Sequence, residues 1–206
     1  MTDINGILFQ MINASANPPP VLLAGARFSA IWLINIAAIW IVLAWLRSGK
    51  TMRLRLFDVG VITVIALSIN VLIAANWYHA RPFELGIGQQ LTPHAADTSF
   101  PSDHGTVLFA IAFATIAAGI GRLWQILALS AAVLTAWSRV YLGIHWPLDM
   151  AGSILIAVCV SLAARPVLGS RTGVKLKNSL LLLFDQILKL AHVPAAIIPR
   201  SFPSNG

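Results

Sequence analysis

The chain has 206 residues, of which 58% are hydrophobic and only 10% are charged, and its mean hydropathy is +0.80. A soluble domain carries about 25% charged residues, so this composition excludes an ordinary soluble protein and predicts one integral membrane domain over residues 1–206. The net charge of +7 does not indicate nucleic acid as a partner, because the basic residues flank apolar runs.

The N-terminal stretch MTDINGILFQMINA lacks the basic start of a signal peptide. Its apolar residues recur at helical spacing: Ile4, Ile7, Leu8, Met11 and Ile12. The spacing predicts an amphipathic helix on the membrane surface, which the NPPP stretch at 17–20 would end.

Five stretches without Asp, Glu, Lys, Arg or His follow, and we expect each to span the membrane: Phe28–Leu46, Val59–Tyr78, Gly105–Gly121, Leu123–Ser138 and Met150–Ala164. The last three are shorter than the roughly 20 residues of an upright span, so they need tilt or flanking residues. Residues 178–199 could form a sixth span. However, Asp185 and Lys189, which could pair on a helix, would then lie mid-bilayer, so we favour an amphipathic inner-surface helix.

The predicted fold is therefore an all-α polytopic helix bundle of about five transmembrane helices, or six, with amphipathic surface helices at both ends. With five spans, most basic residues share one side: Arg47, Lys50, Arg53, Arg55, Arg122, Arg165, Arg171, Lys175 and Lys177. The positive-inside rule makes this side cytoplasmic, with the N-terminus outside and 166–206 as a cytoplasmic or interfacial tail.

Three short polar segments then fall at the outer ends of the spans. They contribute His79 and Arg81; Ser102, Asp103 and His104; and Arg139, His145 and Asp149. Arginine forks suit phosphate oxygens. Ser102 is placed to cap the third span, so the free N–H groups after it, Gly105 included, would form an anion site.

Pro147 suits the first turn of the fifth span, which lets the Asp149 carboxylate orient the His145 imidazole. One histidine could then attack phosphorus while another protonates the leaving oxygen, which indicates phosphoryl transfer.

Each residue alone has a simpler reading: an arginine anchors to headgroups, a histidine sits in the aromatic belt, and Asp149 complements a helix dipole. A zinc site is conceivable from His79, His94, His104 and His145, but their spacing does not favour it. A transporter would place charges within the spans, which are free of them. A purely structural anchor leaves Arg81, His104 and His145 unexplained.

The spaced motifs resemble those of the type 2 phosphatidic acid phosphatase superfamily. That family has Lys, six residues and Arg-Pro; then Pro-Ser-Gly-His; then Ser-Arg, five residues, His, three residues and Asp. The chain has Arg81-Pro82, then PSDH at 101–104, then Ser138-Arg139 with His145 and Asp149 at the family's spacing. The resemblance covers roughly residues 60–165, the expected catalytic core.

The resemblance implies His145 as a nucleophile that forms a phosphohistidine, oriented by Asp149, and His104 as general acid and then base. It implies that phosphate is held by Arg81, Ser102 and Arg139, beside Asp103 and Gly105, with no metal or other cofactor. Two positions depart from the family pattern. Ala74 stands where the motif Lys is expected, with His79 or Asn76 as partial substitutes, and Asp103 replaces the motif Gly.

The motif sequences FPSDHG and SRVYLGIHWPLDM are similar to those of one branch, the bacterial undecaprenyl pyrophosphate phosphatases of the bacitracin-resistance type. This implies hydrolysis of a polyprenyl diphosphate lipid during cell-wall synthesis, by a multi-pass protein of the bacterial inner membrane whose active site faces the periplasm. The nearest alternatives are lipid phosphatases or phosphotransferases acting on phosphatidylglycerophosphate, phosphatidic acid or diacylglycerol pyrophosphate. Besides the lipid substrate, membrane lipids are the expected partners.

Overall fold

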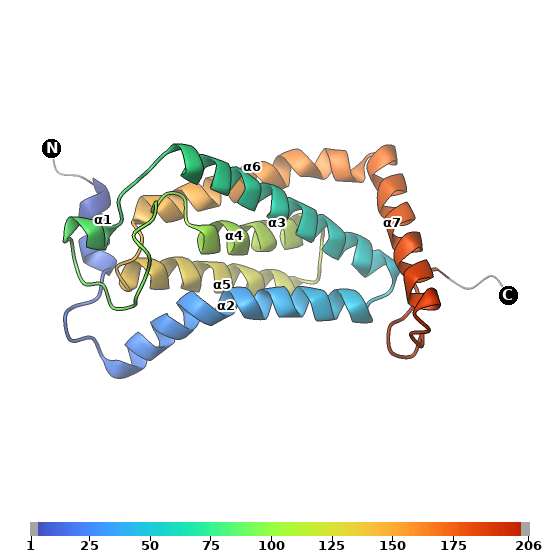
Figure 1. Ribbon diagram of the computed structural model, residues 1–206, viewed down its shortest axis with the longest axis horizontal. Helices are drawn as coiled ribbons and strands as arrows, with labels where there is room; N and C mark the ends of the chain where they lie inside the picture. Colours follow the sequence, from blue (N-terminus) through green and yellow to red (C-terminus); the bar gives the residue numbers. More distant parts are fainter. Residues whose placement is uncertain (1–3, 203–206) are drawn as a thin grey trace.

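The computed structural model describes residues 4–202, which form helices and connecting loops and contain no strand. The helices are α1 (Ile4–Ile12), α2 (Pro20–Arg47), α3 (Lys50–Asn76), a short 3-10 helix η1 (Pro82–Leu85), α4 (Asp103–Ala117), α5 (Arg122–Tyr141), α6 (Pro147–Gly169) and α7 (Arg171–Leu190). Helices α2 to α6 run along the long axis of the molecule, with α1 at one end and α7 across the other (Figure 1). The predicted all-α helix bundle is confirmed.

Four helices are long and apolar enough to cross a membrane, namely α2, α3, α5 and α6, while α4 is a shorter apolar helix. Each of the five helices starts before its predicted span, because a helix need not begin where charged residues end, whereas α3 and α4 end before theirs, at Asn76 and Ala117. Helix α3 already starts at Lys50 and includes Arg53 and Arg55, while α2 starts at Pro20 and includes Arg27. Long cationic side chains can extend from a helix toward a polar neighbour or the interface, so they need not end it.

Helix α4 lies at the centre of the bundle and contacts α3, α5 and α6. Nine of its fifteen residues are buried, whereas Ala26 and Ala30 are the buried residues of the 28-residue α2. Helix α2 instead exposes large apolar side chains such as Trp32 and Ile39. An apolar exterior around a packed interior is what a bundle needs when lipid is its solvent.

Helix α7 crosses the bundle end instead of running along it (Figure 1). Ser170 ends α6 and also caps α7, because its hydroxyl accepts from the Gly173 N–H at 3.1 Å. The conceivable pairing of Asp185 with Lys189 is not what the structure has. Asp185 Oδ2 accepts from the Ser201 N–H at 2.6 Å, and Asp185 Oδ1 lies 3.5 Å from Arg53.

Helix α1 forms as the N-terminal pattern predicted. However, the side chain that packs it against the bundle is Phe9, which is not one of the apolar residues of that pattern. Phe9 is fully buried, and its ring lies 5.1 Å from that of Trp146, whereas Ile4 and Met11 are exposed. Helix α1 thus supports the loop that joins α5 to α6.

Candidate active site

A cavity of about 310 Å³ opens where α3, α4 and α5 meet the loop between η1 and α4. Its walls bring together residues far apart in the sequence: Val71, Ala74, Ala75, Arg81, His94, Asp97, Thr98, Pro101, Asp103, His104, Arg139 and His145. Five of the residues proposed from the sequence as catalytic or phosphate-binding lie in this wall: Arg81, Asp103, His104, Arg139 and His145. The three polar segments therefore converge at one end of the bundle.

His145 is presented by the tight turn between α5 and α6. Gly143 has a φ of +77°, and a Cβ there would lie 2.0 Å from the Gln89 carbonyl oxygen, so only glycine fits the turn. Pro147 then starts α6, as predicted. The Asp149 carboxylate reaches back one turn and accepts the Trp146 N–H at 2.8 Å.

The partners of the His145 ring define which nitrogen carries the proton. Nδ1 lies 2.9 Å from the Ser99 carbonyl oxygen and 3.2 Å from Asp149 Oδ2. A carbonyl oxygen only accepts, so Nδ1 donates and the lone pair is on Nε2. The Ser99 hydroxyl also donates to Asp149 Oδ2, which fixes the carboxylate behind the ring.

The lone pair of His145 faces two guanidinium groups. Arg81 Nη1 lies 3.1 Å and Arg139 Nη2 lies 3.2 Å from His145 Nε2. Arg81 is further held by the Ile144 carbonyl oxygen at 2.7 Å and by the Asp97 carboxylate at 2.7 Å. A nucleophilic nitrogen beside two cationic forks is an arrangement suited to attack on a bound phosphate.

Burial, followed by the positive charges of Arg139 and Arg81, holds the pKa of His145 well below its usual value of 6.5. The imidazole is therefore neutral at physiological pH, and its Nε2 lone pair stays available.

Two of the predicted phosphate-binding residues lie behind the cavity wall. Ser102 is fully buried, and its hydroxyl accepts the Gly105 N–H at 3.4 Å, which confirms it as the cap of α4. Gly105 packs so closely on α6 that a Cβ would lie 3.1 Å from Ser153 Oγ. Both residues position the start of α4 in this structure.

Asp103 is held by a buried amide that the sequence analysis passed over. Asn70 is fully buried on α3, donates to Asp103 Oδ1 at 2.5 Å and accepts from the Thr106 hydroxyl at 2.6 Å. This clamp fixes the carboxylate at the cavity wall, next to His104.

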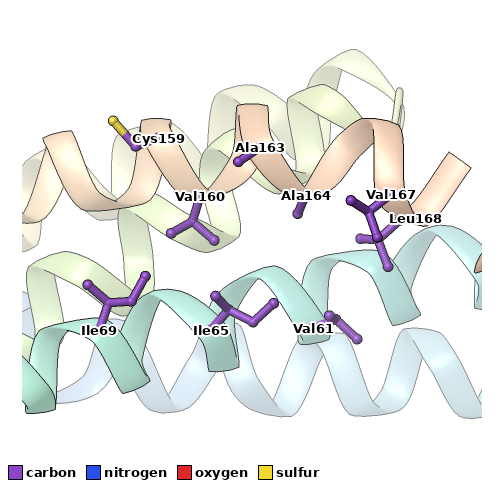
Figure 2. Close-up of a pocket in the computed structure, with 9 residues that line it drawn as sticks. All are labelled: Val61, Ile65, Ile69, Cys159, Val160, Ala163, Ala164, Val167 and Leu168. Atoms are coloured by element: carbon purple, nitrogen blue, oxygen red, sulfur yellow. The ribbon is translucent and has the colours of Figure 1, made fainter.

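Neither a metal site nor, in the groove between α3 and α6, a second phosphate site is found in the described part of the chain. Among residues 4–202, no group of three or more His, Cys, Asp or Glu side chains is arranged to hold a metal ion. A larger groove of about 500 Å³ lies between α3 and α6 (Figure 2), but it is lined by aliphatic residues and Cys159. It offers no cationic group for a phosphate.

Residues 55–172 of the chain match the PAP2 superfamily. The chain belongs to this superfamily. It is 38% identical to YbjG of Escherichia coli (strain K12) over 166 residues, 80% of this chain and 83% of that protein. It is 31% identical to the undecaprenyl-diphosphatase BcrC of Bacillus subtilis (strain 168), over 76% of this chain and 80% of that protein.

The crystal structure of Aquifex aeolicus LpxE has the same fold, with a TM-score of 0.58 and 22% identity over 79% of this chain and 94% of that one. The predicted superfamily and enzyme class are confirmed, and the protein is a membrane lipid phosphatase.

The PAP2 site of this chain differs from the expected one where the motif Lys is missing. Ala74 lines the cavity, but the two suggested substitutes, His79 and Asn76, are not among its lining residues. The Asn76 amide donates to its own helix, and His79 Nδ1 lies 3.6 Å from Asp149 Oδ1. His94 lines the cavity instead, with Nε2 3.1 Å from Arg139 Nη2.

The sequence analysis also missed Asp97 and Ser99. Both lie in the irregular loop that follows η1, where no helical periodicity marks a functional side chain. The signal available was the density of polar residues in HAADTS, at 94–99, just before the PSDH motif.

Proposed function

We propose that this PAP2 protein hydrolyses undecaprenyl diphosphate to undecaprenyl phosphate and inorganic phosphate, through a phosphohistidine on His145. The observation that carries the proposal is the His145 Nε2 lone pair beside Arg81 and Arg139 in the wall of a cavity that would hold one phosphate group. The choice of lipid follows the relative named undecaprenyl-diphosphatase.

In the first step, His145 Nε2 forms a bond to the terminal phosphorus, and the bond from phosphorus to the bridging oxygen breaks. His104, in the cavity wall, donates a proton to that oxygen, so undecaprenyl phosphate leaves. Arg81 and Arg139 stabilise the charge on the equatorial oxygens. Asp149 stabilises the positive charge that develops on the imidazole.

In the second step, water attacks the phosphohistidine. His104 takes the proton from the water, and the bond from phosphorus to Nε2 breaks. Inorganic phosphate and neutral His145 are regenerated, so no external oxidant, reductant or cofactor is needed.

We further propose that the catalytic end of the bundle faces the periplasm of a bacterial inner membrane. The distribution of Lys and Arg supports this, because the opposite end carries Lys50, Arg55, Arg165 and Arg171. Accessibility of single cysteines introduced at Gln90 and at Arg171, in intact cells, would test it. Labelling at 171 and protection at 90 would reverse the orientation.

The substrate is tested with a panel in detergent: undecaprenyl diphosphate, farnesyl diphosphate, phosphatidylglycerophosphate, diacylglycerol pyrophosphate and phosphatidic acid. We expect the highest kcat/KM for undecaprenyl diphosphate; preference for a glycerolipid would reassign the substrate. Rapid quenching with a terminally radiolabelled diphosphate should trap an acid-labile phosphoenzyme that is absent in His145→Gln. Label that persists in this variant would exclude His145 as the nucleophile.

A further inference from the structure

The cavity lacks the positive charge that its proposed ligand requires. Besides its histidines, the ionisable residues of its wall are two arginines, Arg81 and Arg139, and two aspartates, Asp97 and Asp103. These charges cancel, whereas a terminal phosphate brings about two negative charges. Ala74 supplies no compensating cation, so any further positive charge must come from a histidine.

Three histidines line the cavity, and the proposed chemistry occupies two of them. His145 must be neutral to attack phosphorus, and His104 must give up its proton to the leaving group. His104 keeps its positive charge only until the leaving oxygen takes the proton, so His94 is the remaining wall histidine that can stay positively charged beside the phosphate through both steps.

The contacts of His94 show that its Nε2 atom points toward Arg139, one of the proposed phosphate-binding residues. Nδ1 lies 3.1 Å from the Ala95 carbonyl oxygen, so Nδ1 carries the proton and Nε2 accepts from Arg139 Nη2. The same Nη2 lies 3.2 Å from His145 Nε2. One guanidinium nitrogen therefore lies between two imidazole lone pairs, with His94 opposite the nucleophile.

We propose that His94 is a phosphate-binding residue of this site, which takes up a proton from solvent as the terminal phosphate enters and then donates from Nε2 to a phosphate oxygen. The inference rests on the proposed phosphatase function. Arg139 Nη2 would exchange its bond to His94 for one to the same phosphate.

The surroundings of His94 support this change of charge on binding. In the free protein, burial and then the Arg81 and Arg139 charges lower the pKa of His94, against the Ala95 carbonyl and Asp97, which raise it. Asp103 and His104 of α4 and His145 also line the cavity. A bound phosphate screens the two arginines, and Asp97 Oδ1, 3.9 Å from Nδ1, stabilises the imidazolium.

Asp97 also competes with the phosphate for Arg81. Its carboxylate lies 2.7 Å from Arg81 Nη2, yet 63% of its side chain is exposed, so it can be displaced from the guanidinium without unfolding the loop. Once displaced, the carboxylate remains close to the protonated His94.

The test is competitive inhibition of undecaprenyl diphosphate hydrolysis by inorganic phosphate, measured against pH. Three variants are compared with the wild type: His94→Gln, His94→Lys and, as matched control, His192→Asn. His192 lies beyond α7 with a φ of 54°, a conformation that asparagine accepts. The titration of phosphate itself is common to all four proteins and cancels in the comparison.

We expect His94→Gln to raise the inhibition constant about tenfold near neutral pH, and to reduce the proton uptake on phosphate binding by about one, measured by calorimetry in two buffers. His94→Lys should restore tight binding and keep it at alkaline pH, because the lysine cation does not titrate there. A merely structural histidine would not give this restored, pH-shifted binding.

The inference is overturned if His94→Gln has the inhibition constant and proton uptake of the wild type, or if His192→Asn changes them equally. It is also overturned if His94→Lys binds phosphate no better than His94→Gln. A wild type that hydrolyses no lipid diphosphate and binds no phosphate would remove the proposed function as well. Hydrolysis without any effect of His94 would remove only this inference.

Discussion

Both ends of the bundle bury arginine side chains, and Arg53 at one end and Arg139 at the other have different hydrogen-bond partners. At the α7 end, Arg53 donates through each nitrogen, to the Trp45 and Leu46 carbonyl oxygens and to the Ser201 hydroxyl, all within 2.9 Å. At the cavity end, Arg139 donates to two imidazoles through Nη2, while its buried Nε has no hydrogen-bond partner among the described residues.

This difference separates a structural charge from one kept available for a ligand. The bonds of Arg53 join α3 to the end of α2 and to the segment after α7. Each guanidinium nitrogen therefore already has a partner within the protein and is not available to a ligand. Arg139 instead points at neutral ring nitrogens beside a cavity, where a phosphate oxygen would be a better acceptor. Partner chemistry, and not burial alone, therefore distinguishes the two roles.

The strongest test at the cavity end is His145→Gln. We expect kcat/KM for undecaprenyl diphosphate to fall by roughly 10⁴-fold or more, because the amide cannot form the covalent intermediate. Phosphate release and thermal unfolding are measured together. An active variant with unchanged stability would contradict the nucleophile assignment.

Arg139→Lys should lower kcat/KM by about 10²-fold to 10³-fold, because an ammonium cannot donate two parallel hydrogen bonds to phosphate oxygens as the planar fork does. The melting temperature should change little, since the side-chain hydrogen bonds of Arg139 go through one nitrogen to two cavity histidines and do not join helix ends. Steady-state kinetics and thermal unfolding in detergent check this. A loss of stability with normal kinetics would make Arg139 resemble Arg53.

The reverse outcome is expected for Arg53→Gln. Removing the cation leaves two carbonyl oxygens without their donor and the buried Asp185 without its opposite charge, which should lower the free energy of unfolding by about 3–5 kcal/mol. Chemical denaturation measures this loss, and kcat/KM per folded molecule should stay within a factor of about two. A catalytic defect without destabilisation would show that the two ends are not independent.

Asp103→Asn keeps an oxygen to accept from Asn70 but removes a negative charge from the cavity wall. We expect phosphate to inhibit about fivefold more strongly. The inhibition constant is measured beside that of Asp58→Asn, a change at the opposite end. Equal constants for Asp103→Asn and wild type would show that the carboxylate does not act on the ligand.

The smallest expected effect is that of mild acid. Because the pKa of His145 is held well below 6.5, its imidazole stays neutral as the pH falls from about 7.5 to about 6. We therefore expect the imidazole of His145 to show no protonation step between pH about 7.5 and about 6, measured from the NMR chemical shifts of its ring. A protonation step of this ring centred near 6.5 would mean that burial and the two arginines do not depress its pKa.

The parts of the site that the sequence predicted correctly depend on short spacings along one helix. Asp149 reaches His145 from the first turn of α6, and Ser102 caps α4, because both contacts are fixed by local helix geometry. The helical spans likewise followed from apolar runs that no soluble fold would carry.

The missed parts depend on tertiary contacts. Asn70 was read as one residue of an apolar span, since nothing within α3 shows that Asp103 and Thr106 lie opposite it. His94 and Asp97 reach the site through an irregular loop, whose path is set by contacts such as Gln89 with Asn13 and Leu91 with Leu142. Because these contacts join residues far apart in the chain, local sequence patterns cannot predict the path of the loop.

The bond between Asn70 and Asp103 also sets a depth. It places the first residue of α4 level with Asn70, whereas α3 continues to Asn76, so the catalytic floor lies about 9 Å below the end of α3. If the substrate is the proposed polyprenyl diphosphate, a headgroup that reaches this depth would leave the first isoprene units among the apolar side chains of the bundle. The enzyme can then cut the headgroup without lifting the lipid out of the membrane.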